Sequence, residues 1–284
     1  MHDSAAALPQ RGCRKATEKC PQRGSFRAIR RTDAPDGPNR ASEQRPPDGR
    51  LWTATNSFRE TESVASEIER LQQVIDSAVG GSVKARSDGT THDIFPVAIH
   101  PLEGEALSDW VIRERAASSI EIGLGYGMSA LFVFRGLLSN ASSHFRHLAI
   151  DANQTQRFAA IGLQLVDKAG LSDRLDFYGD WSEFVLPRLL AEGRQFDFAF
   201  VDGNHRFDGV FVDLMFLGQL VRGGSVIFLD DYQLPSVKKA VAFCTSNLGW
   251  VIEEEGAADA KHRWVVVRTI AQPRERNFDY FIDF

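Results

Sequence analysis

Apolar residues in this chain follow two spacings that alternate from residue 118 onward. Short apolar runs typical of buried strands are each followed by a longer run in which apolar residues recur three or four positions apart, as on one face of a helix. Strands are predicted at 118–123, 147–151, 174–179, 196–202 and 224–231, and helices at 128–138, 155–169, 182–192, 206–220 and 235–247. This alternation indicates a parallel sheet with helices on both faces.

The last part of the sheet has a different pattern. The runs "GWVIEEE" and "HRWVVVRT" both have strand character, and no helical run separates them. They are therefore expected to pair as an antiparallel hairpin, because antiparallel strands need only a short connection. With the five strands before them they give an α/β fold with a seven-stranded, mostly parallel sheet. Residues 118–270 are predicted to form this domain.

The segments on either side of the domain are expected to be simpler. Residues 51–117 are predicted to be an N-terminal helical segment with an irregular connection at 82–100, since "ETESVASEIERLQQVIDSAV" and "EGEALSDWVIRE" carry apolar residues at helical spacing. Residues 271–284 contain the aromatic stretch "NFDYFIDF". This tail is expected to pack on the domain, and a cap over a substrate cleft or a homodimer contact are the alternatives.

The first fifty residues differ in composition from the rest. The whole chain has a formal net charge of −5, yet residues 1–50 contain eleven Lys and Arg, six Asp and Glu, and six of the eleven prolines. With almost no large apolar side chains, this segment cannot offset the entropy of ordering, so a disordered basic tail is predicted. A transit peptide and a nucleic-acid-binding arm are alternatives. Nucleic-acid binding is not favoured, because most charge runs are simply solvated.

Cysteine usage and hydropathy bear on the cellular setting. The three cysteines are Cys13, Cys20 and Cys244, and their positions indicate neither a disulfide framework nor a zinc site. No run approaches the roughly 18 apolar residues of a membrane helix. A reducing, cytoplasmic setting without membrane attachment is therefore expected.

The first strand of the domain ends in a glycine-rich turn, "EIGLGYG". Gly123, Gly125 and Gly127 allow positive φ angles and close approach of a ligand above the N-terminus of the next helix. The dinucleotide pattern G-x-G-x-x-G is not met, since Met128 occupies its last glycine position. With the carboxylate of Glu121 just ahead, the turn favours a smaller adenosyl ligand with an amino-acid tail. A purely structural turn is the alternative.

The next two strands end in acidic residues that fit the rest of a nucleoside. Asp151 follows the second strand, where a carboxylate can accept hydrogen bonds from both ribose hydroxyls. Asp180 follows the third strand and is a candidate acceptor for the amino group of adenine. For both residues the alternative is a helix N-cap.

Further acidic residues end the fourth and fifth strands. Asp202 is followed by His205, and Asp230 and Asp231 stand next to each other. Carboxylates on neighbouring strand ends repel one another unless a cation neutralises them, and such oxygen ligands suit Mg²⁺, Mn²⁺ or Ca²⁺. His205 is a candidate general base or additional ligand. The alternative is that the acids cap helices or face water and that His205 is an ordinary turn residue.

Together, the motifs "EIGLGYG", "AID", "FVDGNH" and "VRGGSVIFLDDY" give residues from about 100 to 268 a resemblance to the class I S-adenosylmethionine-dependent methyltransferases. More narrowly, this region resembles the small O-methyltransferase-like branch. The resemblance implies a Rossmann-like fold and S-adenosylmethionine as cofactor. For the cofactor it implies Gly123, Gly125, Gly127 and Asp151, for Mg²⁺ it implies Asp202, Asp230 and Asp231, and it implies His205 as catalytic base. From their places at or before the strand ends, Glu121, Asp180 and Asp202 are further expected to bind the cofactor.

One position departs from the pattern of this branch. The catechol type usually has Asp-Asn where this chain has Asp230-Asp231. The expected function is methyl transfer to a hydroxyl oxygen of a small-molecule acceptor, with a divalent metal as a candidate cofactor. An N- or C-methyltransferase without metal is the alternative, as is a catalytically silent binding protein with a nucleic-acid-binding tail.

Overall fold

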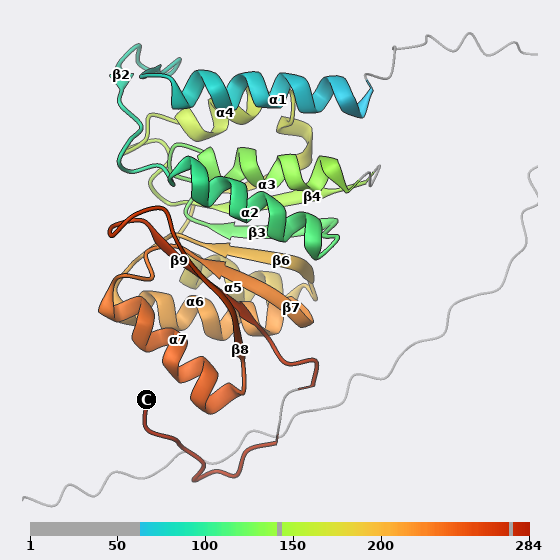
Figure 1. Cartoon of the computed structure of the whole chain (residues 1–284), viewed down its shortest axis with the longest axis vertical. Helices are drawn as coiled ribbons and strands as arrows, with labels where there is room; N and C mark the ends of the chain where they lie inside the picture. Colours follow the sequence, from blue (N-terminus) through green and yellow to red (C-terminus); the bar gives the residue numbers. More distant parts are fainter. Residues whose placement is uncertain (1–62, 141–143, 273–274) are drawn as a thin grey trace, which may run out of the picture. The chain divides into compact units, whose positions relative to one another are not determined.

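The computed structural model describes residues 63–140, 144–272 and 275–284 (Figure 1). The predicted tail at 1–50 lies outside the described residues. The elements are α1 (Val64–Val79), β1 (Val83–Lys84), β2 (Thr91–His92), α2 (Pro101–Arg113), β3 (Ser118–Ile122), α3 (Met128–Ser139), β4 (Arg146–Ile150), α4 (Ile161–Lys168), η1 (Ser172–Arg174), β5 (Leu175–Tyr178), α5 (Ser182–Ala191), β6 (Phe196–Val201), α6 (Phe207–Leu220), β7 (Val221–Leu229), α7 (Pro235–Leu248), β8 (Val251–Ala257) and β9 (Arg263–Arg268).

The main sheet has the strand order β5-β4-β3-β6-β7-β9-β8. The strands from β5 to β7 are parallel, whereas β9 pairs antiparallel with β7 and β8 pairs antiparallel with β9. The predicted seven-stranded sheet with a C-terminal antiparallel hairpin is therefore confirmed. Strand order reverses between β3 and β6, and open sheets of this kind bind ligands beyond the carboxyl ends of the strands at such a point.

Helices cover both faces of the sheet, as the alternation of elements predicted (Figure 1). Neighbouring strand residues point to opposite faces, so Ala149 and Phe200 belong to one apolar cluster, and Ile150 and Val201 to the other. The first cluster is shared with α1 to α4 and the second with α5 to α7. These two buried layers hold the strand ends in fixed register.

One predicted helix begins later than its pattern indicated. The run at 155–169 was expected to be helical throughout, but α4 starts at Ile161, and the residues between β4 and α4 form turns. Ala159 and Ala160 have φ of 48° and 57°, in the left-handed region that interrupts a helix. The side chain of Gln154 donates to the backbone oxygen of Gly125 at 2.6 Å, so this turn is held against the glycine loop.

The C-terminal tail lies against α7. The side-chain amide of Asn247 donates to the backbone oxygen of Ile282, and the backbone N–H of Ile282 donates to Asn247 in return, both at 2.8 Å. The rings of Phe243 and Phe284 are 5.2 Å apart and nearly perpendicular. Among the described residues, no helix is both long and apolar enough to cross a bilayer.

Candidate active site at the carboxyl ends of the strands

The glycine loop joins β3 to α3 and passes close to the end of β6. Gly123, Gly125 and Gly127 have φ of 94°, 51° and 83°, which L side chains rarely adopt. A Cβ on Gly123 would lie 2.0 Å from the backbone oxygen of Asp202, so only glycine allows the two strand ends to approach this closely. The loop therefore brings the end of β6 directly beside the turn.

Asp151, at the end of β4, is tied to the same loop. Its Oδ2 accepts hydrogen bonds from the backbone N–H of Gly125 at 2.8 Å and from the side chain of Gln154 at 3.0 Å. Its Oδ1 accepts from the backbone N–H of Asn153 at 2.7 Å. A carboxylate offers about four acceptor positions, so Asp151 retains the capacity to accept from a ligand.

A cavity of about 640 Å³ opens at these strand ends. This volume is in the range typical of small-molecule and cofactor sites. Its lining joins the glycine loop, the end of β4, the start of α5 and the loop that leads into α6. The lining residues are Val97, Ile122, Gly123, Gly125, Ile150–Asn153, Arg157, Phe158, Asp180–Glu183, Asp202–His205, Asp208, Gly209, Val212 and Asp213.

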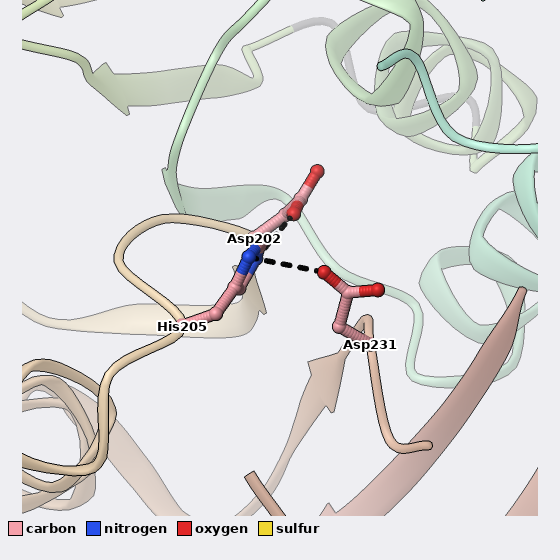
Figure 2. Close-up of side chains that lie close together, drawn as sticks. All are labelled: Asp202, His205 and Asp231. Atoms are coloured by element: carbon pink, nitrogen blue, oxygen red, sulfur yellow. Dashed lines mark hydrogen bonds and ion pairs between the residues drawn. The ribbon is translucent and has the colours of Figure 1, made fainter. Parts of the chain in front are cut away.

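His205 lies between two carboxylates beside this cavity (Figure 2). Its Nε2 is 3.0 Å from Oδ1 of Asp202, and its Nδ1 is 3.1 Å from Oδ2 of Asp231. One ligand atom from each of the three residues lies within 4.8 Å of the others. Two carboxylates at this spacing fit a hard divalent cation, and the imidazole between them is placed to act as a general base or as a further ligand.

Burial and mutual repulsion perturb these groups. Burial raises the pKa of Asp202 to about 6, and the hydrogen bond from His205 offsets part of that rise. The same hydrogen bond is the main cause of a raised pKa at His205, with the charges of Asp202 and Asp231 adding to it. Perturbed acids and bases that meet in a cleft are typical of functional sites.

Asp230 lies next to this cluster and interacts with Glu103, a residue that none of the sequence motifs includes. Burial raises the pKa of Asp230 to about 7, with the charges of Asp202 and Asp231 adding to the rise. Glu103 of α2 is fully buried and interacts with Asp230, and burial is the main cause that raises its pKa to about 11. The protonated form of Glu103 is therefore favoured beside the Asp230 carboxylate.

A signal for Glu103 is present in the sequence. In α2, Glu103 precedes Leu107 and Val111 by four and eight residues, so it belongs to the buried face of the helix. A carboxyl group in the middle of an apolar face needs a partner inside the protein. The periodicity thus marks the residue, but only the tertiary structure identifies Asp230 as its neighbour.

The remaining predicted residues fall in different places. Asp180 lines the cavity, and its two oxygens accept from the backbone N–H of Trp181 at 2.9 Å and from Arg188 at 2.8 Å. Glu121 is fully buried under the loop rather than in the cavity lining. Its carboxylate accepts from the Ser129 hydroxyl at 2.9 Å and lies 3.3 Å from Nε2 of His147.

Of the expected set, the structure therefore gathers Asp151, Asp180, Asp202 and His205 around one cavity. Asp231 adjoins them through His205. Gly127, Glu121 and Asp230 support the strand ends from outside the lining.

Comparisons with known proteins identify the family and the fold. Residues 120–232 match a protein family described as a methyltransferase domain. The chain is 31% identical to catechol O-methyltransferase from Sus scrofa over 144 residues, which are 49% of this chain and 73% of that protein. It is 26% identical to caffeoyl-CoA O-methyltransferase from Stellaria longipes over 185 residues, covering 61% of this chain and 74% of that protein.

A solved structure shows the same fold. The O-methyltransferase TomG from Streptomyces achromogenes, crystallised with S-adenosylmethionine, superposes with a TM-score of 0.55 at 18% identity, over 71% of this chain and 90% of that one. The predicted Rossmann-like fold is thereby confirmed, as is the resemblance stated from the sequence motifs. This chain belongs to the family of S-adenosylmethionine-dependent O-methyltransferases.

Proposed function

We propose that this protein transfers the methyl group of S-adenosylmethionine to a hydroxyl oxygen of a small molecule, next to a divalent cation held at the strand ends. The observation that carries the proposal is the cluster of Asp202, His205 and Asp231, whose ligand atoms lie within 4.8 Å of one another beside the glycine loop. Family membership supports the methyl transfer, and the donor set supports the cation.

The glycine loop and Asp151 position the cofactor. The loop leaves room for the amino-acid part, and Asp151 accepts from the ribose hydroxyls, as its place at the end of β4 predicts. In-line displacement needs the sulfonium methyl group and the acceptor oxygen to be aligned at near-contact distance, and the protein mainly supplies that alignment. The bond between the methyl carbon and sulfur breaks as the carbon bonds to oxygen, and a base must accept the hydroxyl proton.

Asp202 and Asp231 would hold the cation, and the nearby carboxylate of Asp230 would add negative charge. A divalent cation bound there would supply Lewis-acid activation of a substrate hydroxyl group by lowering its pKa. In the structure, both ring nitrogens of His205 face carboxylates. Carboxylates that were engaged by a cation would interact less strongly with the imidazole, and a ring nitrogen of His205 would then be able to accept the hydroxyl proton.

Several finer expectations belong to the same proposal. The relatives are named for catechol and caffeoyl-CoA, so an acceptor with aromatic hydroxyl groups is the first class to test. Mg²⁺ is the proposed cation, because carboxylate oxygens dominate the cluster. A cytoplasmic setting and a homodimer stay predictions from the sequence.

Labelled methyl transfer tests the proposal. The wild type is incubated with methyl-labelled S-adenosylmethionine and catechol or caffeoyl-CoA, and the product is identified by mass spectrometry. We expect O-methylated product with Mg²⁺ and at least a hundredfold slower turnover with EDTA or in Asp231→Ala, because the hydroxyl is then not activated. Asp173→Ala, an exposed acidic residue of η1, serves as the matched control and should turn over like the wild type.

Two outcomes separate this proposal from its rivals. Product methylated on nitrogen or carbon, formed equally well with EDTA, would support the metal-free alternative. Unchanged O-methylation in both EDTA and Asp231→Ala would keep the transfer reaction and remove the cation from it.

A further inference from the structure

A second buried carboxyl group, outside the cation cluster, lines the same cavity. Asp213, on α6, lines the cavity although its side chain is only 1% exposed. Among the described residues, its Oδ2 has no hydrogen-bond partner. A buried acceptor without a donor costs free energy, so such a group in a ligand cavity is expected to find its donor in the ligand.

The first turn of α5 lies next to Asp213. The Ser182 hydroxyl interacts with its carboxylate and opposes the rise in pKa that burial causes. This ten-residue helix begins at Ser182, and Trp181 before it makes no side-chain capping bond. The backbone N–H groups of Ser182 and Glu183 have no acceptor inside the helix, so they are free to donate.

An acceptor and two backbone donors thus stand next to each other in the cavity lining. The Watson–Crick edge of adenine has the complementary pattern, since its 6-amino group donates and its N1 accepts. Hypoxanthine, in which an oxygen replaces the amino group, has the opposite pattern at both positions. The polar groups of this site therefore match adenine and oppose its 6-oxo analogue.

Topology places a nucleobase in this region. Asp151, proposed for the ribose, ends β4, and the neighbouring strand β5 leads through Asp180 and Trp181 into α5. The cavity is continuous from Asp151 to Asp213. A nucleoside with its ribose at Asp151 therefore has its base near the start of α5.

We propose that Asp213 and the first turn of α5 recognise the adenine edge of the cofactor, with Asp213 accepting from the 6-amino group and a backbone N–H of α5 donating to N1. This inference rests on the proposed function and moves the adenine role from Asp180 to Asp213. Asp180 is 42% exposed and already pairs with Trp181 and Arg188, whereas Asp213 is buried and has an unused oxygen.

Binding of two ligands that differ only at the 6-position tests the proposal. S-adenosylhomocysteine and its 6-oxo analogue S-inosylhomocysteine are titrated calorimetrically into the wild type at pH 8. We expect the adenosyl ligand to bind at least about tenfold more tightly, because the analogue leaves buried polar groups unpaired. Equal affinities in the wild type would overturn the assignment without any variant.

Two variants test which residue discriminates between the adenosyl ligand and its 6-oxo analogue. In Asp213→Asn the amide is able to donate to the 6-oxygen, so the ratio of the two affinities should fall severalfold towards one. In Asp180→Asn the ratio should stay at its wild-type value. A ratio that is unchanged in Asp213→Asn, or that falls only in Asp180→Asn, would contradict the proposal.

The test also separates this inference from the function on which it rests. If the adenosyl ligand binds the wild type but is not preferred, only the adenine assignment fails. If neither ligand binds at millimolar concentration, the cofactor site itself is wrong and the assignment fails with it.

Discussion

Nδ1 of His205 lies 3.1 Å from Oδ2 of Asp231, so the histidine of one strand end is joined to the carboxylate of the next (Figure 2). The other ring nitrogen of His205, Nε2, lies 3.0 Å from Oδ1 of Asp202. This arrangement stabilises the doubly protonated imidazolium, which donates to both carboxylates. The same two carboxylates are the proposed ligands of the cation, so proton and cation compete for them.

This competition predicts how His205 titrates. In protein free of divalent cations, its pKa should lie above the ordinary value of 6.5, mainly because Asp202 accepts its hydrogen bond. Saturating Mg²⁺ should lower that pKa, since the cation repels the imidazolium and takes up the carboxylates. Asp202→Asn should lower it as well. Side-chain NMR titration measures the value, with His205→Gln to assign the resonance.

His262 provides the internal control for this measurement. It pairs with Asp259 outside the cavity lining, so Mg²⁺ should leave its resonance in place. A pKa of His205 that does not respond to Mg²⁺ while His262 is also unchanged would argue against a cation at this cluster.

The glycine loop gives a prediction about stability. Gly123→Ala should destabilise the protein much more than Gly193→Ala, although both glycines have positive φ, of 94° and 69°. A Cβ at Gly193 meets nothing within 4 Å, whereas at Gly123 it meets the backbone oxygen of Asp202 at 2.0 Å. We expect about 1–2 kcal/mol for Gly193→Ala from backbone strain and at least about 2 kcal/mol more for Gly123→Ala.

Chemical denaturation of the two variants measures the difference. Equal losses in the free energy of unfolding would mean that the end of β6 adjusts easily, and that the close approach of Gly123 and Asp202 is not a fixed feature.

Asp213 predicts how stability depends on pH. Its pKa is about 7 in the folded protein, against an ordinary value of 3.8, chiefly because of burial, with the charge of Glu183 adding to the rise and Ser182 opposing it. At a pH between these two pKa values, Asp213 keeps its proton in the folded state and releases it in the unfolded state. The free energy of unfolding should therefore fall as pH rises from about 4 to 7, by up to about 1.4 kcal/mol per pH unit from this group.

Asp213→Asn should remove that contribution and flatten the dependence, while Asp173→Asn, an exposed residue of η1, should not. Urea denaturation at a series of pH values provides the comparison. If Asp213→Asn shows the same slope as the wild type, the carboxyl group of Asp213 does not titrate with the raised pKa that its burial predicts.

Much of the fold follows from local patterns. Apolar strands and amphipathic helices alternate strongly enough to predict the parallel sheet, and the missing helix between the last two strands predicts the hairpin. The late start of α4 was not predictable in this way. The run at 155–169 has helical spacing, but the contacts of Gln154 with Gly125 and Asp151 hold its first residues in turns.

Residues of the candidate site were recognisable in the sequence only where they follow a strand. Asp151, Asp202 and His205 are found that way, because parallel strands end at one edge of the sheet. Glu103 and Asp213 belong to helices, and their roles depend on which groups pack opposite them. A helical carboxyl group on a buried face is visible in the sequence, but its partner is set by tertiary contacts.

Binding of S-adenosylhomocysteine measured by titration calorimetry tests the central claim most directly, because that claim is that the cavity below the glycine loop holds a sulfonium nucleoside with its ribose on Asp151. The account predicts one site per chain with a dissociation constant in the micromolar range, and at least about tenfold weaker binding in Asp151→Ala. The absence of binding heat at millimolar ligand, or wild-type affinity in Asp151→Ala, would contradict it.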